Sequence, residues 1–171
     1  MDKFCKDTWE NLIPVDMETQ KLIRSKGILS GSTLFGGGGD DSDIDYIVRY
    51  TPDIMNRLTN QNSFSYYKSR LYKEPDTLSV YVKFDKIKRP INLIVCNSDE
   101  SFKAWTTATK LFAFFIQSDL KIEYKVIKDK NYRVSLFKSF REMLKNVFTN
   151  FEEYSQDSTV NDDYPDDDIP F

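Results

Sequence analysis

The 171-residue sequence contains no histidine. This absence excludes Ser-His-Asp and Cys-His catalysis, histidine metal ligands and imidazole acid–base chemistry. Only two cysteines are present, Cys5 and Cys96, and they lack CxxC spacing, which argues against both a disulfide scaffold and a cysteine zinc site. Any catalysis must therefore use carboxylates, hydroxyl groups or lysines.

Long hydrophobic runs are also missing. The longest, Leu111 to Ile116, falls far short of the roughly twenty apolar residues that cross a bilayer, and the N-terminus carries no apolar signal segment. The sparse cysteine content fits a reducing compartment. We therefore expect a cytoplasmic protein that does not associate with membranes.

The composition is that of a folded chain: 40% of the residues are hydrophobic, 15% aromatic and 30% charged. This length supports one domain with a sizeable core, but not two full domains. After Tyr154 the composition shifts to Ser, Asp, Asn and Pro. We therefore expect one domain over residues 1–154 and a disordered acidic tail over residues 155–171.

The net charge of −3 is distributed unevenly along the chain. Residues 64–148 hold 17 Lys and Arg against 9 Asp and Glu, net +8, whereas residues 149–171 hold 8 acidic residues and no basic one, net −8. The basic segment suits the phosphates of a nucleotide or nucleic acid, or is simply a solvated surface. The acidic end suits a partner-docking segment or a cover over that basic surface.

Local sequence patterns predict an α+β fold, a small mixed sheet flanked by helices. Capping residues and helical spacing of apolar side chains predict helices, and alternating or β-branched runs predict strands. Gly31 to Phe35 predicts a turn into a short helix, which the four glycines from Gly36 to Gly39 end. The expected helices are 16–26, 51–60, 98–117 and 134–153, and the expected strands are 28–30, 43–48, 78–84 and 91–96.

Two aspartates, Asp43 and Asp45, form a DxD pattern on a predicted strand. Side chains two apart on a strand share a face, so these carboxylates can hold a hard divalent cation together. Gly31 and Ser32 open a predicted helix whose amides, with the Ser32 hydroxyl, can meet a phosphate. Lys110, on the helix after the last strand, is a candidate phosphate contact; a solvated lysine is the alternative.

The ordered set of helix, short strand, Gly-Ser, short helix, loop and DxD strand resembles the nucleotidyltransferase superfamily, which includes DNA polymerase beta-like enzymes. The matching residues are Ile28–Gly36 and Ser42–Val48, and the resemblance covers residues 16–96. It implies nucleotidyl transfer from a nucleoside triphosphate with two magnesium ions, held by Asp43 and Asp45 as the catalytic carboxylates.

The resemblance also implies a third carboxylate on a neighbouring strand, where this chain has Asn92. An asparagine can ligate a metal through its carbonyl oxygen, but it cannot accept a proton from the attacking hydroxyl. Asp85, near the end of the preceding strand, is a possible substitute. The sequence therefore leaves open whether the chain is an active enzyme.

The chain ends in an acidic segment closed by an apolar pair, Asp166-Asp167-Asp168-Ile169-Pro170-Phe171. Such a peptide suits a pocket with an apolar hole for Phe171 and a basic rim for its terminal carboxylate. The six residues resemble the C-terminal tip of bacterial single-stranded DNA-binding proteins, at the same place in the chain. In that family the tip recruits exonucleases, helicases, a uracil-DNA glycosylase and a polymerase subunit.

The upstream chain does not resemble the barrel domain of that second family. The combination therefore suggests a mimic of the tip, encoded by a bacteriophage and acting in the bacterial cytoplasm on a host DNA repair or replication enzyme. We expect a nucleotidyltransferase-fold protein that engages such an enzyme. Three activities remain open: nucleotidyl transfer, an inactive interaction module or inhibitor, and nucleic-acid binding gated by the acidic tail.

Overall fold

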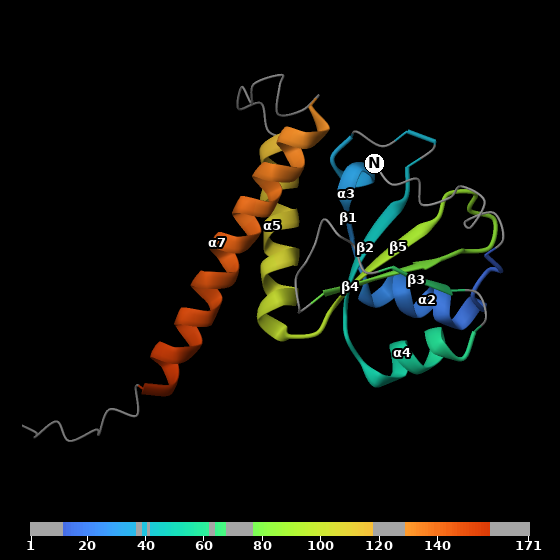
Figure 1. The fold of residues 1–171 in the computed structure, drawn as a ribbon, viewed down its shortest axis with the longest axis horizontal. Helices are drawn as coiled ribbons and strands as arrows, with labels where there is room; N and C mark the ends of the chain where they lie inside the picture. The colour runs from blue at the N-terminus through green and yellow to red at the C-terminus, as the bar shows by residue number, and fades with distance from the viewer. Residues whose placement is uncertain are drawn as a thin grey trace, which may run out of the picture.

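The computed structural model describes residues 12–36, 39–40, 42–61, 64–67, 77–117 and 129–157, and it confirms the predicted α+β class. One mixed sheet lies between two pairs of helices, α2 with α4 on one side and α5 with α7 on the other (Figure 1). The elements in chain order are α2 (Met17–Lys26), β1 (Ile28–Ser30), α3 (Gly31–Leu34), β2 (Ile44–Arg49), α4 (Pro52–Thr59), β3 (Phe64–Tyr67), β4 (Thr77–Val82), β5 (Ile91–Cys96), α5 (Asp99–Gln117) and α7 (Lys130–Asp157).

The sheet has the strand order β1-β2-β5-β4-β3. The central pair, β2 and β5, is parallel, whereas the other three pairs are antiparallel. A parallel pair requires a long crossover connection, which α4, β3 and β4 provide here. The two inner strands thus bring residues 44–49 beside residues 91–96.

Helix ends form where capping residues predict them. The Asp16 carboxylate accepts a hydrogen bond from the Thr19 amide at 2.7 Å, and the Thr51 hydroxyl accepts one from the Ile54 amide at 3.2 Å. Ser98 caps α5 in the same way, accepting from the Ser101 amide at 3.1 Å. These bonds satisfy amides that a helix leaves unpaired in its first turn, which is why short local motifs locate these ends.

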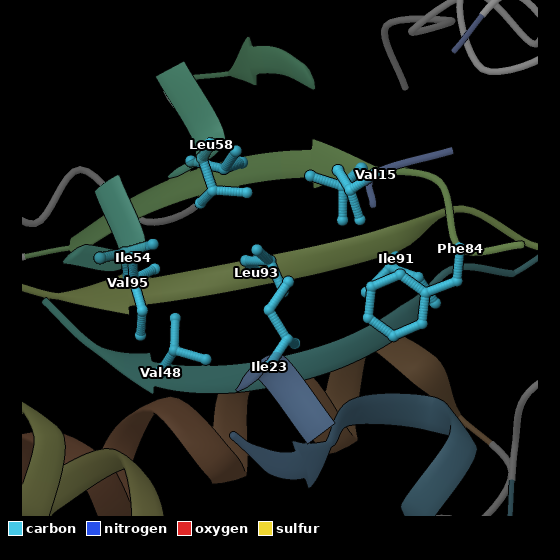
Figure 2. Packing of buried hydrophobic residues seen from close by; sticks show 11 residues of the cluster. Val15, Ile23, Val48, Ile54, Leu58, Phe84, Ile91, Leu93 and Val95 are labelled. Atoms are coloured by element: carbon cyan, nitrogen blue, oxygen red, sulfur yellow. The ribbon is translucent and has the colours of Figure 1, made fainter. Parts of the chain in front are cut away.

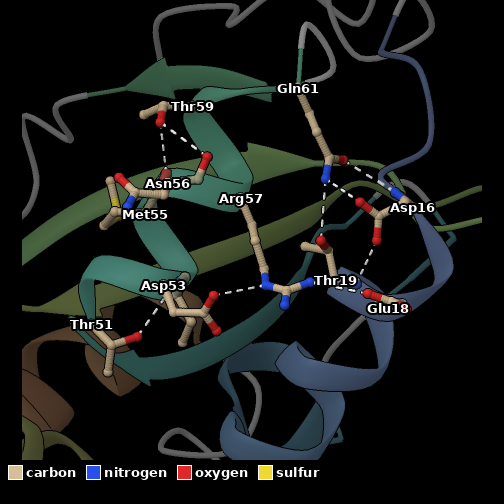
Figure 3. Close-up of polar contacts among 11 residues, drawn as sticks. Asp16, Glu18, Thr19, Thr51, Asp53, Met55, Asn56, Arg57, Thr59 and Gln61 are labelled. Atoms are coloured by element: carbon tan, nitrogen blue, oxygen red, sulfur yellow. Dashed lines mark hydrogen bonds and ion pairs between the residues drawn. The ribbon is translucent and has the colours of Figure 1, made fainter.

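Polar contacts join α2 to α4, the two helices on one side of the sheet (Figure 3). The Gln61 side chain bonds both the backbone amide and the carboxylate of Asp16. Arg57 on α4 pairs with Asp53 at 3.0 Å and with Glu18 of α2 at 3.4 Å. Solvent screens exposed pairs of this kind, so they contribute little to stability and mainly orient the helices.

Each face of the sheet has its own apolar cluster, because alternate residues of a strand point to opposite faces. The cluster under α2 and α4 is shown in Figure 2, and it consists of Val15, Ile23, Val48, Ile54, Leu58, Val80, Val82, Phe84, Ile91, Leu93 and Val95. The cluster under α5 and α7 consists of Ile47, Ile94, Cys96, Trp105, Ala108, Phe112 and Phe137. Asp45 and Asn92 belong to the second face, since they precede Ile47 and Ile94 by two positions.

Two features differ from the sequence-based prediction. The structure contains strand β3, which pairs with β4 and which the sequence does not predict. Helix α7 begins at Lys130 instead of residue 134, because the Asp129 carboxylate accepts from the Asn131 and Tyr132 amides at 2.9 and 3.2 Å. The same helix continues to Asp157, past the expected start of the tail after Tyr154. Among the described helices, none combines the length and apolar character needed to cross a bilayer.

Candidate metal and nucleotide site

A row of polar residues crosses four neighbouring strands at one level. Ser30 on β1 is opposite Asp45 on β2, Asp45 is opposite Asn92 on β5, and Asn92 is opposite Tyr81 on β4. Residues paired across neighbouring strands share a face, so all four side chains lie on the side of the sheet that α5 covers. Ser30 confirms this placement, because its hydroxyl lies 2.9 Å from that of Thr109 on α5.

The Asn92 side chain is the direct neighbour of Asp45. Its amide nitrogen donates to Asp45 Oδ1 at 2.8 Å. Only 6% of Asn92 is exposed, and its buried Oδ1 has no hydrogen-bond partner within the described part of the chain. A buried carbonyl oxygen without a partner is costly, and beside a carboxylate it is a suitable ligand for a cation.

Asp43 immediately precedes β2, one residue outside the strand on which the sequence predicts it. The Tyr81 hydroxyl donates to Asp43 Oδ2 at 3.3 Å, a long hydrogen bond. Tyr81 and Asn92 are opposite each other, and they contact Asp43 and Asp45 respectively. The two carboxylates therefore lie near the same end of this face.

The electrostatics of Asp45 reflect its burial and the nearby charge of Asp43. Burial, followed by the charge of Asp43, raises the pKa of Asp45 from its ordinary value of 3.8 to about 7. The Asn92 hydrogen bond and the charges of Lys130 and Arg89 act in the opposite direction on that pKa. A divalent cation between the two carboxylates would stabilise the ionised form of Asp45 and lower this pKa.

Gly31 contacts Asp45 closely at the start of α3. Its φ is +64°, and a Cβ added there would lie 1.8 Å from Asp45 Oδ2. Any other residue would displace the carboxylate and strain the backbone. The Gly-Ser pair thus allows α3 to begin directly beside the second aspartate, and Ser32 follows within the first turn of this helix.

The remaining predicted contacts are more distant. Lys110 is exposed on α5, and the structure places it against neither aspartate. Asp85 lines a shallow hollow with residues of α2, on the opposite side of the sheet from Asp45, so it cannot replace the third carboxylate. The docking residues Asp166, Asp167, Asp168, Ile169, Pro170 and Phe171 lie outside the described residues, as do Gly37, Gly38 and Asp41.

Sequence reasoning missed three residues of this region: Tyr81, Arg89 and Lys130. Tyr81 could have been found from strand alternation and the register of β4 with β5. Arg89 lies in a connection between strands and bonds mainly to backbone and hydroxyl oxygens, which leaves no sequence signal. Lys130 acts on Asp45 across a large sequence separation, which no local pattern reveals.

The donor set consists of two carboxylates and one amide oxygen. No group of three or more Asp, Glu, Cys or His residues arranged for a metal is present among the described residues. Mg²⁺ is commonly held by one or two carboxylates together with substrate phosphates, so Asp43 and Asp45 fit one such ion. A second ion would meet Asn92 where the resemblance implies a carboxylate.

No protein family, curated protein or solved structure matches this chain.

Proposed function

We propose that this chain binds a magnesium–nucleoside triphosphate complex at Asp43 and Asp45, and that its C-terminal tip brings this site to a host DNA repair or replication enzyme. The observation that supports the site is the position of the Asp45 carboxylate between Gly31 and Asn92, near Asp43. Burial and the nearby charge of Asp43 raise the pKa of Asp45, so this pair of carboxylates favours a cation.

Within this proposal each residue has a defined role. Asp43 and Asp45 hold the metal, and Asn92 orients Asp45 through its 2.8 Å hydrogen bond. Gly31 leaves room for the Asp45 carboxylate, and Ser32 at the start of α3 contacts a phosphate. Lys110 would reach the phosphates only by extending from α5. A magnesium ion held there would offset part of the negative charge of the triphosphate.

The C-terminal tip supplies the partner. The segment from Asp166 to Phe171 resembles the tip of bacterial single-stranded DNA-binding proteins, and it offers an apolar anchor and a run of aspartates. The anchor would determine affinity, and the aspartates would mainly speed the encounter in a salt-sensitive way. This combination fits a bacteriophage protein that redirects a host enzyme.

Asn92 favours a second candidate function, nucleotide binding without transfer. A general base at this position would accept the proton of the attacking hydroxyl, which an amide cannot do. The chain would then act as a nucleotide-responsive interaction module or as an inhibitor of the docked enzyme. Replacement of Asn92 by Asp distinguishes nucleotidyl transfer from nucleotide binding without transfer. If transfer appears only in Asn92→Asp, the natural chain binds the nucleotide without transferring it.

The first experiment is a pull-down from bacterial lysate with the full chain and with a variant lacking Phe171. We expect one DNA repair or replication enzyme to be retained by the full chain and lost from the variant, as identified by mass spectrometry. Identical lists from the two proteins would contradict the docking role of the tip. An enzyme that the full chain retains and the variant lacking Phe171 does not would also serve as the acceptor in a transfer assay.

The second experiment tests the nucleotide site. We expect Asp43→Asn to abolish magnesium-dependent binding of a nucleoside triphosphate, measured by calorimetry, while leaving the pull-down unchanged. Asp85→Asn is the matched control, because it removes an exposed carboxylate on the opposite side of the sheet. Equal nucleotide affinity in Asp43→Asn and the control would rule out the proposed site.

A further inference from the structure

Arg89 makes a dense set of hydrogen bonds next to the candidate site. Its Nε donates to the Ser42 carbonyl oxygen at 2.7 Å. Its Nη2 donates to Ser42 Oγ at 2.7 Å, to Thr33 Oγ1 at 2.8 Å and to the Asp43 carbonyl oxygen at 2.8 Å. One half-buried guanidinium thus joins α3, the residues before β2 and the connection between β4 and β5.

These contacts differ from an ordinary ion pair. Within the described part of the chain, Arg89 makes no salt bridge with a carboxylate, and its acceptors are two carbonyl and two hydroxyl oxygens. A guanidinium can serve several acceptors at once because its donors lie in a rigid plane, whereas a lysine has a single ammonium group. The arrangement therefore depends on the shape of the group as well as on its charge.

The segment that Arg89 holds needs such a support. It follows Gly39, which has no side chain to anchor this segment. The Ile44 amide donates to the Pro90 carbonyl oxygen at 2.9 Å, so β2 pairs with the β5 side only from this residue onward. Asp43 lies just before that point, where the Arg89 contacts fix its backbone on the side of α3.

We propose that Arg89 is a positioning residue that holds the backbone of Ser42 and Asp43 against α3, and so places the Asp43 carboxylate where it can share a metal ion with Asp45. This inference rests on the proposed function. It concerns a residue that touches neither metal nor nucleotide, and that acts only through the position of Asp43.

The first test measures the affinity for Mn²⁺ with ATP in Arg89→Gln and Arg89→Lys. We expect both variants to bind about 10- to 100-fold more weakly than the natural chain, the usual range for residues that orient a metal ligand. Lysine keeps the charge but cannot bridge the four acceptors, so it should not restore affinity. Restored affinity in Arg89→Lys would show that charge alone matters, and would overturn the proposal.

Two further variants separate positioning from general stability. Arg57→Gln removes an arginine that also joins two elements, on the opposite side of the sheet, and should leave Mn²⁺–ATP binding unchanged. Thr33→Val with Ser42→Ala removes the two hydroxyl acceptors while keeping Arg89, and should weaken binding less than Arg89→Gln. This double variant also tests the proposal if Arg89→Gln does not fold, and unchanged affinity in it would then contradict the proposal.

Hydrogen exchange provides a readout that does not need the metal. In Arg89→Lys we expect the amides of Ser42 and Ile44 to exchange faster, while the Gly27 amide at the end of α2 keeps its protection. Unchanged exchange at Ser42 and Ile44 would overturn the positioning role. If the natural chain binds no Mn²⁺–ATP, the proposed function fails, and exchange alone decides whether Arg89 orders this segment.

Discussion

Asp45 responds to pH in a way that differs from an ordinary aspartate. Its pKa is about 7 in the folded chain, against 3.8 for an unperturbed carboxyl group. Between these two values the unfolded chain has already released the proton that the folded chain retains. The free energy of unfolding should therefore fall as pH rises from about 4 to about 7, and become level above that range.

Asp45→Asn should remove this slope. We expect the variant, without metal, to match the natural chain near pH 4 and to be more stable by about 1–2 kcal/mol at pH 8, less than full linkage because solvent reaches part of the carboxylate. Urea denaturation at the two pH values measures the difference. Asp85→Asn serves as the control. If the free energy of unfolding depends on pH in the same way in Asp45→Asn and in Asp85→Asn, the burial of the Asp45 charge is contradicted.

Gly31 and Gly36 provide a matched pair for a second prediction. Both have positive φ, +64° and +76°, but a Cβ would meet Asp45 at Gly31 and nothing within 4 Å at Gly36. Gly36→Ala should cost only the backbone strain, about 1 kcal/mol. Gly31→Ala should lower the stability measured by thermal unfolding more than Gly36→Ala does, and it should also weaken Mn²⁺–ATP binding. Equal losses of stability and affinity in the two variants would contradict the close contact with Asp45.

Strand periodicity predicts that Asp43 and Asp45 share a face, and the resemblance to nucleotidyltransferases places Asn92 on a neighbouring strand. In the structure the Asn92 amide nitrogen donates to Asp45 Oδ1 at 2.8 Å. Arg89 and Tyr81 were not predicted as site residues, because they reach Asp43 from other segments through side-chain geometry. A single sequence carries periodicity, but it does not carry the distance between two segments brought together by folding.

The same distinction holds for helices and strands. Helix ends at Asp16 and Thr51 were predicted because a cap bonds an amide three positions away in sequence. Strand β3 was missed because it exists only through its pairing with β4, and its four residues carry no clear alternation. The start of α7 was missed because Asp129, its cap, precedes a first turn rich in basic and polar residues instead of apolar ones.

Helix α7 contributes the buried ring of Phe137 to the cluster that it shares with α5, beside the buried Arg141, whose guanidinium lies over the Trp105 ring. The Phe137 ring lies 5.5 Å from Trp105, 5.8 Å from Phe112 and 5.9 Å from Phe35, measured between ring centroids. Phe137→Ala should destabilise the domain by about 3 kcal/mol, because it leaves a cavity between α5, α7 and α3. Phe114→Ala, at a ring that is 62% exposed, should change the urea midpoint little; similar losses would contradict this packing.

For the whole molecule, the charge distribution predicts an effect of the C-terminal segment on nucleic-acid binding. Truncation after Asp157 keeps α7 intact and removes five acidic residues, changing the net charge from −3 to +2. We expect the truncated chain to bind single-stranded DNA more tightly, with an affinity that falls steeply as salt increases. Fluorescence anisotropy measures both effects. Unchanged affinity after truncation would rule out the acidic segment as a cover.

The contacts that define the candidate site join residues far apart in sequence. Asn92 and Asp45 are 47 positions apart, and Ser30 and Thr109 are 79 positions apart. A chain emerging from the ribosome therefore cannot form the complete site until the sequence of α5 has left the exit tunnel. A ligand that binds the proposed site only in the finished sheet would therefore raise the free energy of unfolding of the whole sheet.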